Sequence, residues 1–244
     1  MIINTIGCSF TYAQQKGWPK ILADKLNAEL VNNGHPGAGN TYIGNKIVLD
    51  SYQHRYQKPD LVVIMWSGLT RKEVAVDHTD IVTMGVLDSY KDYVRWSGFD
   101  TSYILSGGIK GSWEWNPATK AIFDPLYKYS NERTMAQDTL LQILHTQNYL
   151  KQNNIKYLMS SYVNYWGNED QVAQLDYGIG KFSDLKYLVD QIDFDRWVFA
   201  NSNRDCIYEL AKANNDLQED GFHPDFKTHA DWAELILQKL KTDN

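Results

Sequence analysis

The chain has 244 residues, with 30 acidic and 24 basic side chains and a formal net charge of −6. This acidic balance argues against a nucleic-acid partner, because proteins that bind a phosphate backbone concentrate Lys and Arg on one face. Hydrophobic residues form 43% of the sequence, which excludes an intrinsically disordered chain, and two cysteines, Cys8 and Cys206, are too few for a disulfide framework.

The sequence carries no signal of a membrane protein. The longest strongly apolar run covers residues 61–66, whereas a helix needs about 20 apolar residues to cross a bilayer. Residues 1–4 carry no charged leader before an apolar stretch, so we expect no signal peptide and no membrane span. The low cysteine content favours a reducing compartment, and we expect a cytoplasmic or virion-associated protein.

The first part of the chain alternates apolar runs with amphipathic stretches. Residues 1–7 and 61–66 are apolar runs typical of buried strands, and residues 30–32 indicate a further short strand. Between them, residues 18–30 and 41–56 repeat their apolar side chains at helical spacing. This alternation predicts an α/β fold, with a parallel sheet covered by helices on both faces.

The alternation stops after the third strand. Residues 72–130 place many aromatic side chains among Gly, Ser and Asp, and we interpret them as an insertion with some irregular or hairpin structure. Regular elements then return, and we expect a helix over 131–154, a strand over 156–163, and helices over 183–190, 204–214 and 228–241. We find no repeat and no linker, so we predict a single domain over residues 1–244.

The aromatic residues of the insertion allow two interpretations. In the first, Trp96, Trp113, Trp115 and their neighbours form a satellite core, because an insertion of this size needs buried surface of its own. In the second, a few of them stay exposed beside the ligand crevice and stack on sugar rings or on an acyl chain.

Ser9 is a candidate nucleophile because it follows the first predicted strand, where ligands of open parallel sheets bind. Gly7 before it permits a tight turn. Cys8 is the alternative nucleophile, but adjacent residues of an extended chain point in opposite directions, so only one of the two can face the crevice. Ser9 could instead cap the following helix.

Asp220 and His223 lie three residues apart in a glycine-containing turn before the last predicted helix. A serine nucleophile needs an imidazole that takes its proton and a carboxylate that holds this imidazole in the correct tautomer. One short loop can supply both groups, although Asp-Gly is also a common dipeptide of solvated turns.

Two further loops follow the second and third predicted strands. Gly37-Ala38-Gly39-Asn40 offers backbone N–H groups and a side-chain amide, and Gly68-Leu69-Thr70-Arg71 follows the most apolar strand. Acyl transfer needs donors aimed at the oxygen on which negative charge develops, and glycine allows the backbone to come close. Both loops could equally be ordinary turns between strand and helix.

The order of these four elements resembles the SGNH hydrolase family, also called GDSL-type esterases and lipases. The likeness is greatest to phage and bacterial members that open with Gly-Cys-Ser-Phe-Thr, as residues 7–11 do here. The resemblance implies a three-layer α/β/α sandwich of flavodoxin-like type with a mostly parallel central sheet. The aromatic-rich insertion would follow the third strand.

The resemblance also implies roles for single residues. Ser9 matches the nucleophile, His223 the general base, and Asp220 the residue that orients the base. The oxyanion donors would be the Ser9 N–H, the N–H of Gly37 (or of Gly39 in the alternative register) and a loop Asn. Thr70 stands where family members typically carry this Asn, and its hydroxyl, Asn40 or Arg71 could supply the missing donor.

Losing one oxyanion donor typically costs about 10²–10³ in rate, so the sequence leaves more than one function open. In the first interpretation the protein hydrolyses a small-molecule or glycan ester, removing an acetyl-like O-acyl group, and needs no metal and no organic cofactor. In the second it is a catalytically impaired SGNH-fold module that binds carbohydrate or belongs to a virus particle. A third is an acyltransferase that uses a sugar in place of water.

Overall fold

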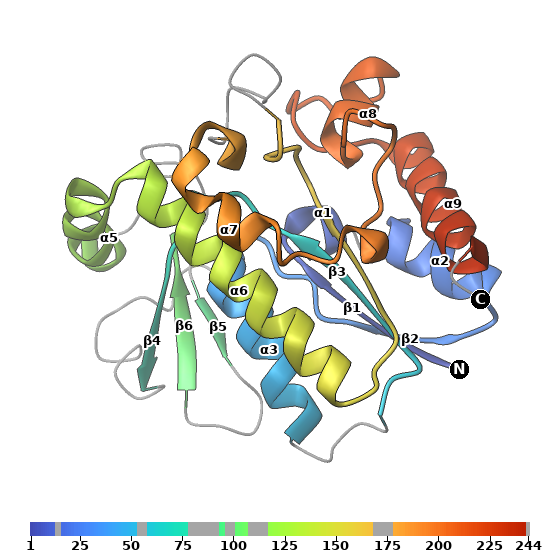
Figure 1. Ribbon diagram of the computed structural model, residues 1–244, viewed down its shortest axis with the longest axis horizontal. Helices are drawn as coiled ribbons and strands as arrows, with labels where there is room; N and C mark the ends of the chain where they lie inside the picture. The colour runs from blue at the N-terminus through green and yellow to red at the C-terminus, as the bar shows by residue number, and fades with distance from the viewer. Residues whose placement is uncertain are drawn as a thin grey trace.

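The computed structural model describes residues 1–12, 16–52, 58–77, 93–95, 101–106, 117–167 and 178–242. Its central sheet consists of four parallel strands in the order β2 (Glu29–Asn32), β1 (Ile2–Gly7), β3 (Leu61–Trp66) and β7 (Tyr157–Ser161) (Figure 1). All six residues of β3 are buried, as expected for a strand in the middle of a sheet that is covered on both faces.

The strand order reverses between β1 and β3. The chain runs from β1 outward to β2 and then returns to the other side of β1 to form β3. Ligands of open α/β sheets bind outside the carboxyl ends of the strands at such a reversal. Gly7 lies level with Met65, and Met65 lies level with Ser160. The segments that follow β1, β3 and β7 therefore leave the sheet side by side.

Helices cover both faces of this sheet (Figure 1). The pairs that pack together are α3 (Asn40–Tyr52) with α6 (Glu132–Gln152), and α2 (Trp18–Lys25) with α9 (Phe226–Thr242). α9 buries Trp232, Ile236 and Leu240, which recur every four residues along one face of the helix. The predicted α/β class, with a mostly parallel sheet between two helix layers, is confirmed.

Short helices connect these layers. They are α1 (Ser9–Tyr12), α7 (Lys186–Val189), α8 (Ile207–Ala213) and 3-10 turns at Ile179–Lys181, Ser183–Leu185 and Phe194–Arg196. The helix predicted over 18–30 ends early, because Asn27 adopts a left-handed backbone (φ 48°) before β2 begins. Within the described ranges, no helix combines the length and the apolar character that a membrane span requires.

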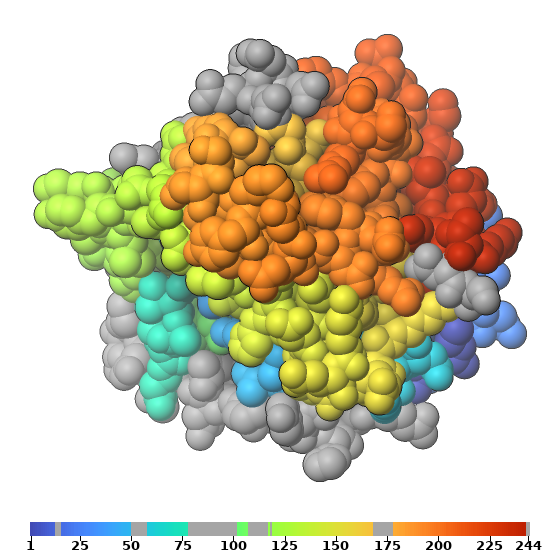
Figure 2. Space-filling view, viewed as in Figure 1, coloured from blue at the N-terminus to red at the C-terminus, as the bar shows by residue number. Residues whose placement is uncertain are grey.

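The stretch over 72–130 contains regular structure. β4 (Glu73–Asp77), β6 (Thr101–Leu105) and β5 (Tyr93–Arg95) form an antiparallel sheet in the order β4-β6-β5, and α5 (Pro117–Tyr129) follows it. This sheet lies to one side of the central sheet (Figure 1), and α5 projects from the body of the molecule above β4 (Figure 2).

Part of this stretch has its own small core. Ile104, Phe123, Tyr127 and Met135 form a buried cluster apart from the main one. Phe123 and Tyr127 are aromatic residues of the insertion, and their burial in this cluster agrees with the first interpretation, a satellite core. Trp96, Trp113 and Trp115 lie outside the described residues, so the second interpretation stays a prediction, as does the single domain over 1–244.

Candidate active site

Ser9 lies where the chain turns from β1 into α1. Gly7 makes this turn possible, because a Cβ at Gly7 would lie 2.2 Å from Thr11 Oγ1 and 2.7 Å from the Met65 carbonyl oxygen. Cys8 is fully buried in the core, whereas Ser9 is partly exposed. Of the two candidate nucleophiles, Ser9 is therefore the one that solvent and a ligand can reach.

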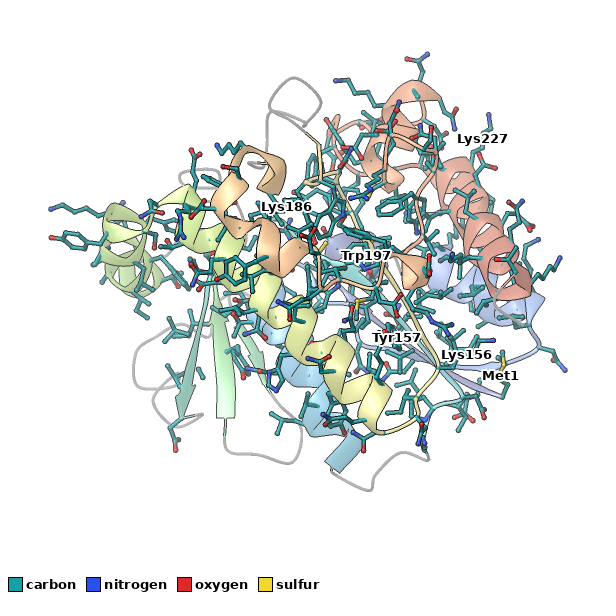
Figure 3. The ribbon with its side chains drawn as sticks, viewed as in Figure 1. Met1, Lys156, Tyr157, Lys186, Trp197 and Lys227 are labelled. Carbon is teal, nitrogen blue, oxygen red and sulfur yellow. The ribbon has the colours of Figure 1, made fainter. Side chains whose placement is uncertain are left out.

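The turn before α9 lies at the same end of the molecule. Met1 and Lys156, at the amino ends of two parallel strands, lie close together at the right of the view, and Lys227, in the first turn of α9, lies well above them (Figure 3). The turn that carries Asp220 and His223 immediately precedes α9 and is thus brought to the carboxyl edge of the sheet.

The conformation of this turn follows from a few local bonds. Gly221 takes a left-handed backbone with φ 67°, which favours glycine. One carboxylate oxygen of Asp220 accepts the N–H groups of Phe222 and His223, each at 2.9 Å. The N–H of Gln218 donates to the His223 carbonyl oxygen at 2.8 Å and closes the turn. The backbone of His223 is therefore held by its own loop.

Three side chains form a continuous line of hydrogen bonds across this edge. His223 Nε2 lies 2.8 Å from Ser9 Oγ, and His223 Nδ1 lies 2.5 Å from the second carboxylate oxygen of Asp220. A neutral imidazole satisfies both contacts when Nδ1–H donates to Asp220 and Nε2 accepts from the serine hydroxyl. This is the arrangement in which the imidazole can take the proton of Ser9.

The electrostatics of Asp220 suit this arrangement. Burial by itself raises the pKa of Asp220, but hydrogen bonds from the His223 ring and from the N–H groups of His223 and Phe222 outweigh it. The pKa of this carboxyl therefore lies below its ordinary value, and Asp220 is ionised at neutral pH. An ionised Asp220 also stabilises the imidazolium that would form during proton transfer.

Aromatic side chains hold the imidazole from behind. The ring of Phe10 lies 5.0 Å from the His223 ring and stacks on Tyr162 at 4.7 Å, measured between centroids. Phe222 contacts the His223 ring edge-on at 5.2 Å. Phe10 and Tyr162 are buried, so the ring of His223 rests on a fixed surface.

The glycine-rich loop lies next to the start of α1. His35 N–H donates to the Gly7 carbonyl oxygen at 2.9 Å, and Ala38 N–H donates to the His35 carbonyl oxygen at 3.1 Å. Gly37 is buried and adopts a left-handed backbone with φ 80°. The N–H of Gly39 is engaged by the carboxylate of Glu73. Gly37 and Gly39 were the two alternatives for the oxyanion donor of this loop. Because Glu73 already binds the N–H of Gly39, the geometry favours the N–H of Gly37.

Asn40 is committed to the scaffold. Its Nδ2 donates to the Ser67 carbonyl oxygen and to Thr139 Oγ1, each at 3.1 Å, and its Oδ1 accepts the Ser67 N–H at 2.7 Å. Both amide hydrogens are used, and the side chain is buried. Asn40 thus joins the start of α3 to the end of β3 and to α6, and this geometry disfavours it as an oxyanion donor.

Thr70 and Arg71 follow β3 at the edge that carries Ser9. Thr70 is buried, and its carbonyl oxygen accepts the Tyr127 hydroxyl at 2.6 Å. Arg71 Nη1 donates to the Ala38 carbonyl oxygen at 3.2 Å, and its guanidinium carbon lies 5.5 Å from the centroid of the Tyr162 ring. Arg71 therefore bridges the glycine-rich loop and the aromatic stack behind His223.

A cavity of about 140 Å³ opens beside Arg71, between the first turn of α3 and α6. Its lining is mixed in charge, because Arg71 and Lys72 face it together with Asp138. Lys72 Nζ lies 3.2 Å from the Asp138 carboxylate. Among the described residues, no group of three or more His, Cys, Asp or Glu side chains is placed to hold a metal ion.

The family of the chain follows from a match along nearly its whole length. The model of a family of unknown function, DUF6071, matches residues 5–242. The chain belongs to the DUF6071 family. A search among curated proteins finds no match for this DUF6071 chain.

Solved structures show what the DUF6071 fold is similar to. A member of the lipolytic G-D-S-L family from Veillonella parvula superposes with a TM-score of 0.52 at 11% identity, covering 98% of this chain and 97% of that one. The structure of TesA superposes with a TM-score of 0.52 at 14% identity, covering 99% of each chain. At such low identity the likeness concerns the fold, and the DUF6071 chain has the fold of GDSL-type lipolytic proteins.

The structure brings together Ser9, Asp220 and His223, which the sequence analysis names as candidates, and surrounds them with aromatic residues that the sequence analysis does not name. Phe10 and Phe222 are direct neighbours of Ser9 and His223, so their place in the two motifs was an available signal. Tyr162 and Glu73 carried no such signal, because each reaches the site from another strand end through tertiary packing.

Proposed function

We propose that this DUF6071 protein is a serine ester hydrolase of the SGNH type. The observation that carries the proposal is the line of hydrogen bonds from Asp220 through His223 to Ser9. This line supports the proposal because the three side chains, as nucleophile, base and orienting carboxylate, would act at the reversal point of the sheet, where α/β proteins bind ligands.

The mechanism follows from the roles of these groups. Ser9 Oγ attacks the ester carbonyl carbon while His223 Nε2 accepts its proton, and Asp220 stabilises the imidazolium. The tetrahedral intermediate expels the alcohol, which receives the proton from His223. Water, deprotonated by His223, then attacks the acyl-enzyme, releases the acid and restores Ser9.

The oxyanion site combines backbone and side-chain donors. The N–H of Ser9 and the N–H of Gly37 are the backbone donors, and both lie at the edge where β1 ends. Thr70 supplies a hydroxyl at the position of the family Asn, and Arg71 contributes positive charge beside the loop. We assign the polar groups of the substrate to the side of Arg71 and its cavity.

The proposed substrate is a small or glycan ester that carries an acetyl-like O-acyl group. Ser9 and His223 are only partly buried, which leaves room for a bulky alcohol portion on the solvent side. The aromatic residues of the insertion would contact this portion.

Hydrolysis of a chromogenic acetyl ester by the purified protein tests the proposal. Ser9→Ala should lower kcat by at least about 10³-fold, because the nucleophile is lost. Ser183→Ala, the same change at an exposed serine, should leave kcat unchanged. A fluorophosphonate should add its mass to the unmodified protein and to Ser183→Ala but not to Ser9→Ala. Equal hydrolysis and equal labelling with and without Ser9 would refute the proposal.

The alternative is a module with an SGNH fold that binds carbohydrate or belongs to a virus particle. Thr70 in place of the family Asn is the observation that favours it. The same experiment separates the two: a protein that neither hydrolyses esters nor reacts with the phosphonate, yet binds glycans with and without Ser9, is the module. Acyl transfer to a sugar would appear as an acylated sugar among the products.

A further inference from the structure

Glu73 connects the second sheet to the glycine-rich loop. It is the first residue of β4, yet its carboxylate lies against Gly39, where a Cβ would come within 2.3 Å of Glu73 Oε1. The carboxylate accepts the N–H of Gly39 and, at 3.4 Å, the N–H of Tyr42. Glu73 thus satisfies backbone donors at the start of α3 that the helix itself cannot pair.

The same loop is held at its other end by the segment that carries Ser9. A Cβ at Gly34 would lie 2.6 Å from the backbone nitrogen of Tyr12 in α1, so the two backbones are in direct contact. His35 N–H donates to the Gly7 carbonyl oxygen. The loop from 34 to 39 therefore spans from α1 to Glu73, with Gly37 between the two attachments.

We propose that Glu73 is a positioning residue for the oxyanion loop, whose ionised carboxylate fixes Gly39 and thereby sets the place of the Gly37 N–H relative to Ser9. The inference rests on the proposed ester hydrolase function and deepens it. Glu73 touches no reacting atom in this scheme and acts through the loop. The residue ties the activity of the site to the sheet β4-β6-β5.

The groups around Glu73 come from four elements. Arg71 and Lys72 precede it in the chain, and Lys72 is paired with Asp138 of α6. Tyr103 of β6 faces it, and Asn45 of α3 donates to the Tyr103 hydroxyl at 3.1 Å. Among these groups, the charges of Arg71 and Lys72 favour the ionised form of Glu73 and oppose the effect of its burial.

The titration of Glu73 gives the inference a specific signature. Burial raises the pKa of Glu73 to about 7, against the opposing effect of the Tyr42 and Gly39 N–H groups and of the Lys72 and Arg71 charges. Protonation weakens the hold on Gly39, because a neutral acid is a poorer acceptor than a carboxylate. Protonation of Glu73 should therefore lower the activity by about as much as Glu73→Gln does, with a midpoint near pH 7.

The test compares Glu73→Gln with Glu29→Gln, the same change at the exposed amino end of β2. For Glu73→Gln we expect kcat to fall roughly tenfold with little change in KM, because a small misplacement of oxyanion donors affects the transition state. As the pH falls from about 8 to 6, the slope of log kcat against pH should be steeper for the natural protein than for Glu73→Gln, because only the natural protein loses the carboxylate of Glu73 in this range. Glu29→Gln should retain the natural slope.

A second measurement uses the natural protein alone and tests the role of Glu73 even if Glu73→Gln does not fold. In the natural protein, the backbone amide resonances of Gly37 and Gly39 should shift together with a midpoint near pH 7. Unchanged kcat and slope in a folded Glu73→Gln protein, or flat Gly37 and Gly39 resonances, would overturn the role of Glu73. Phosphonate labelling of Ser9 would persist in that case, so this failure differs from a failure of the proposed function, in which Ser9 is not labelled at all.

Discussion

Nε2 of His223 lies 2.8 Å from Oγ of Ser9, although 214 positions separate the two residues in the chain. The fold produces this contact in two steps. β1 delivers Ser9 to the carboxyl edge of the sheet, and the packing of α9 against α2 delivers the turn before α9 to the same edge. Local bonds within each segment then set the orientation of the side chains.

Asp220→Asn tests the orienting role of the carboxylate. The amide oxygen can still accept the N–H groups of Phe222 and His223, so the turn should keep its shape. The amide nitrogen would then donate to Nδ1 and place the imidazole hydrogen on Nε2, which prevents it from accepting the Ser9 proton. We expect kcat for an acetyl ester to fall by about 10³-fold or more.

The matched control is Asp24→Asn, at an exposed carboxylate of α2 that makes no contact with Ser9, Asp220 or His223 in the hydrogen bonds described above. It should leave kcat unchanged. Circular dichroism and thermal unfolding of Asp220→Asn should match the natural protein, because the turn is preserved. A folded Asp220→Asn protein with nearly full activity would contradict the assignment of Asp220.

Thr70→Val tests whether the hydroxyl replaces the amide of the family Asn. The two side chains have nearly the same shape, so the change removes the donor with little change of packing around a buried position. If the hydroxyl donates to the oxyanion, kcat should fall by about 10²-fold at nearly constant KM. A change of less than threefold in the steady-state kcat would show that Thr70 does not contribute.

Asn40→Ala separates a structural role from an oxyanion role. The change leaves the Ser67 N–H and carbonyl and the Thr139 hydroxyl without their partner in a buried place. We expect the free energy of unfolding in urea to fall by about 3 kcal/mol, because each unsatisfied buried group costs about 1–3 kcal/mol. The fraction that stays folded should keep a kcat within tenfold of the natural value, whereas a loss of 10²-fold or more would restore Asn40 as an oxyanion donor.

The site shows which features local sequence signals can predict. Ser9, Asp220 and His223 could be named as candidates because each follows an apolar strand or precedes an amphipathic helix, and each stands beside a glycine or in a turn. Tyr162 and Glu73 were not, because an aromatic residue after a strand and a glutamate that begins one occur throughout such folds. Their roles arise from the strand order and from the contact between two sheets.

The fold shows the same division. The central strands and long helices were predicted from apolar periodicity, whereas α5 was missed because prolines at both its start and its interior, Pro117 and Pro125, indicate a break. Pro117 occupies the first helical position, where the missing N–H has no cost. The antiparallel sheet β4-β6-β5 was expected only as unplaced hairpin structure, because β4 carries no regular alternation of buried and exposed positions that would fix its bounds.

The final prediction concerns the pH dependence of stability. His229 is buried in α9, and its Nδ1 accepts the Trp18 N–H at 3.3 Å. Burial, with a smaller contribution from the nearby His223, lowers the pKa of His229 from 6.5 to about 4, against the opposing effect of Asp216 and Asp225. The folded protein therefore keeps this imidazole neutral, whereas the unfolded chain binds a proton below pH 6.5.

The sign of the effect follows from this difference. The contribution of His229 to stability is fully present above pH 6.5 and is lost as the pH falls toward 4, by about 1.4 kcal/mol for each pH unit. Glu73, with its raised pKa, makes stability change with pH in the opposite direction, so the informative quantity is the difference in stability between a variant and the natural protein.

His229→Asn keeps an acceptor for the Trp18 N–H but does not titrate. Between pH 6.5 and 5, its free energy of unfolding in urea should fall by about 2 kcal/mol less than that of the natural protein. The control is His145→Asn, at an exposed position of α6, which should follow the natural protein. If the free energy of unfolding of His229→Asn changes with pH in parallel with that of the natural protein, His229 titrates alike in the folded and unfolded states.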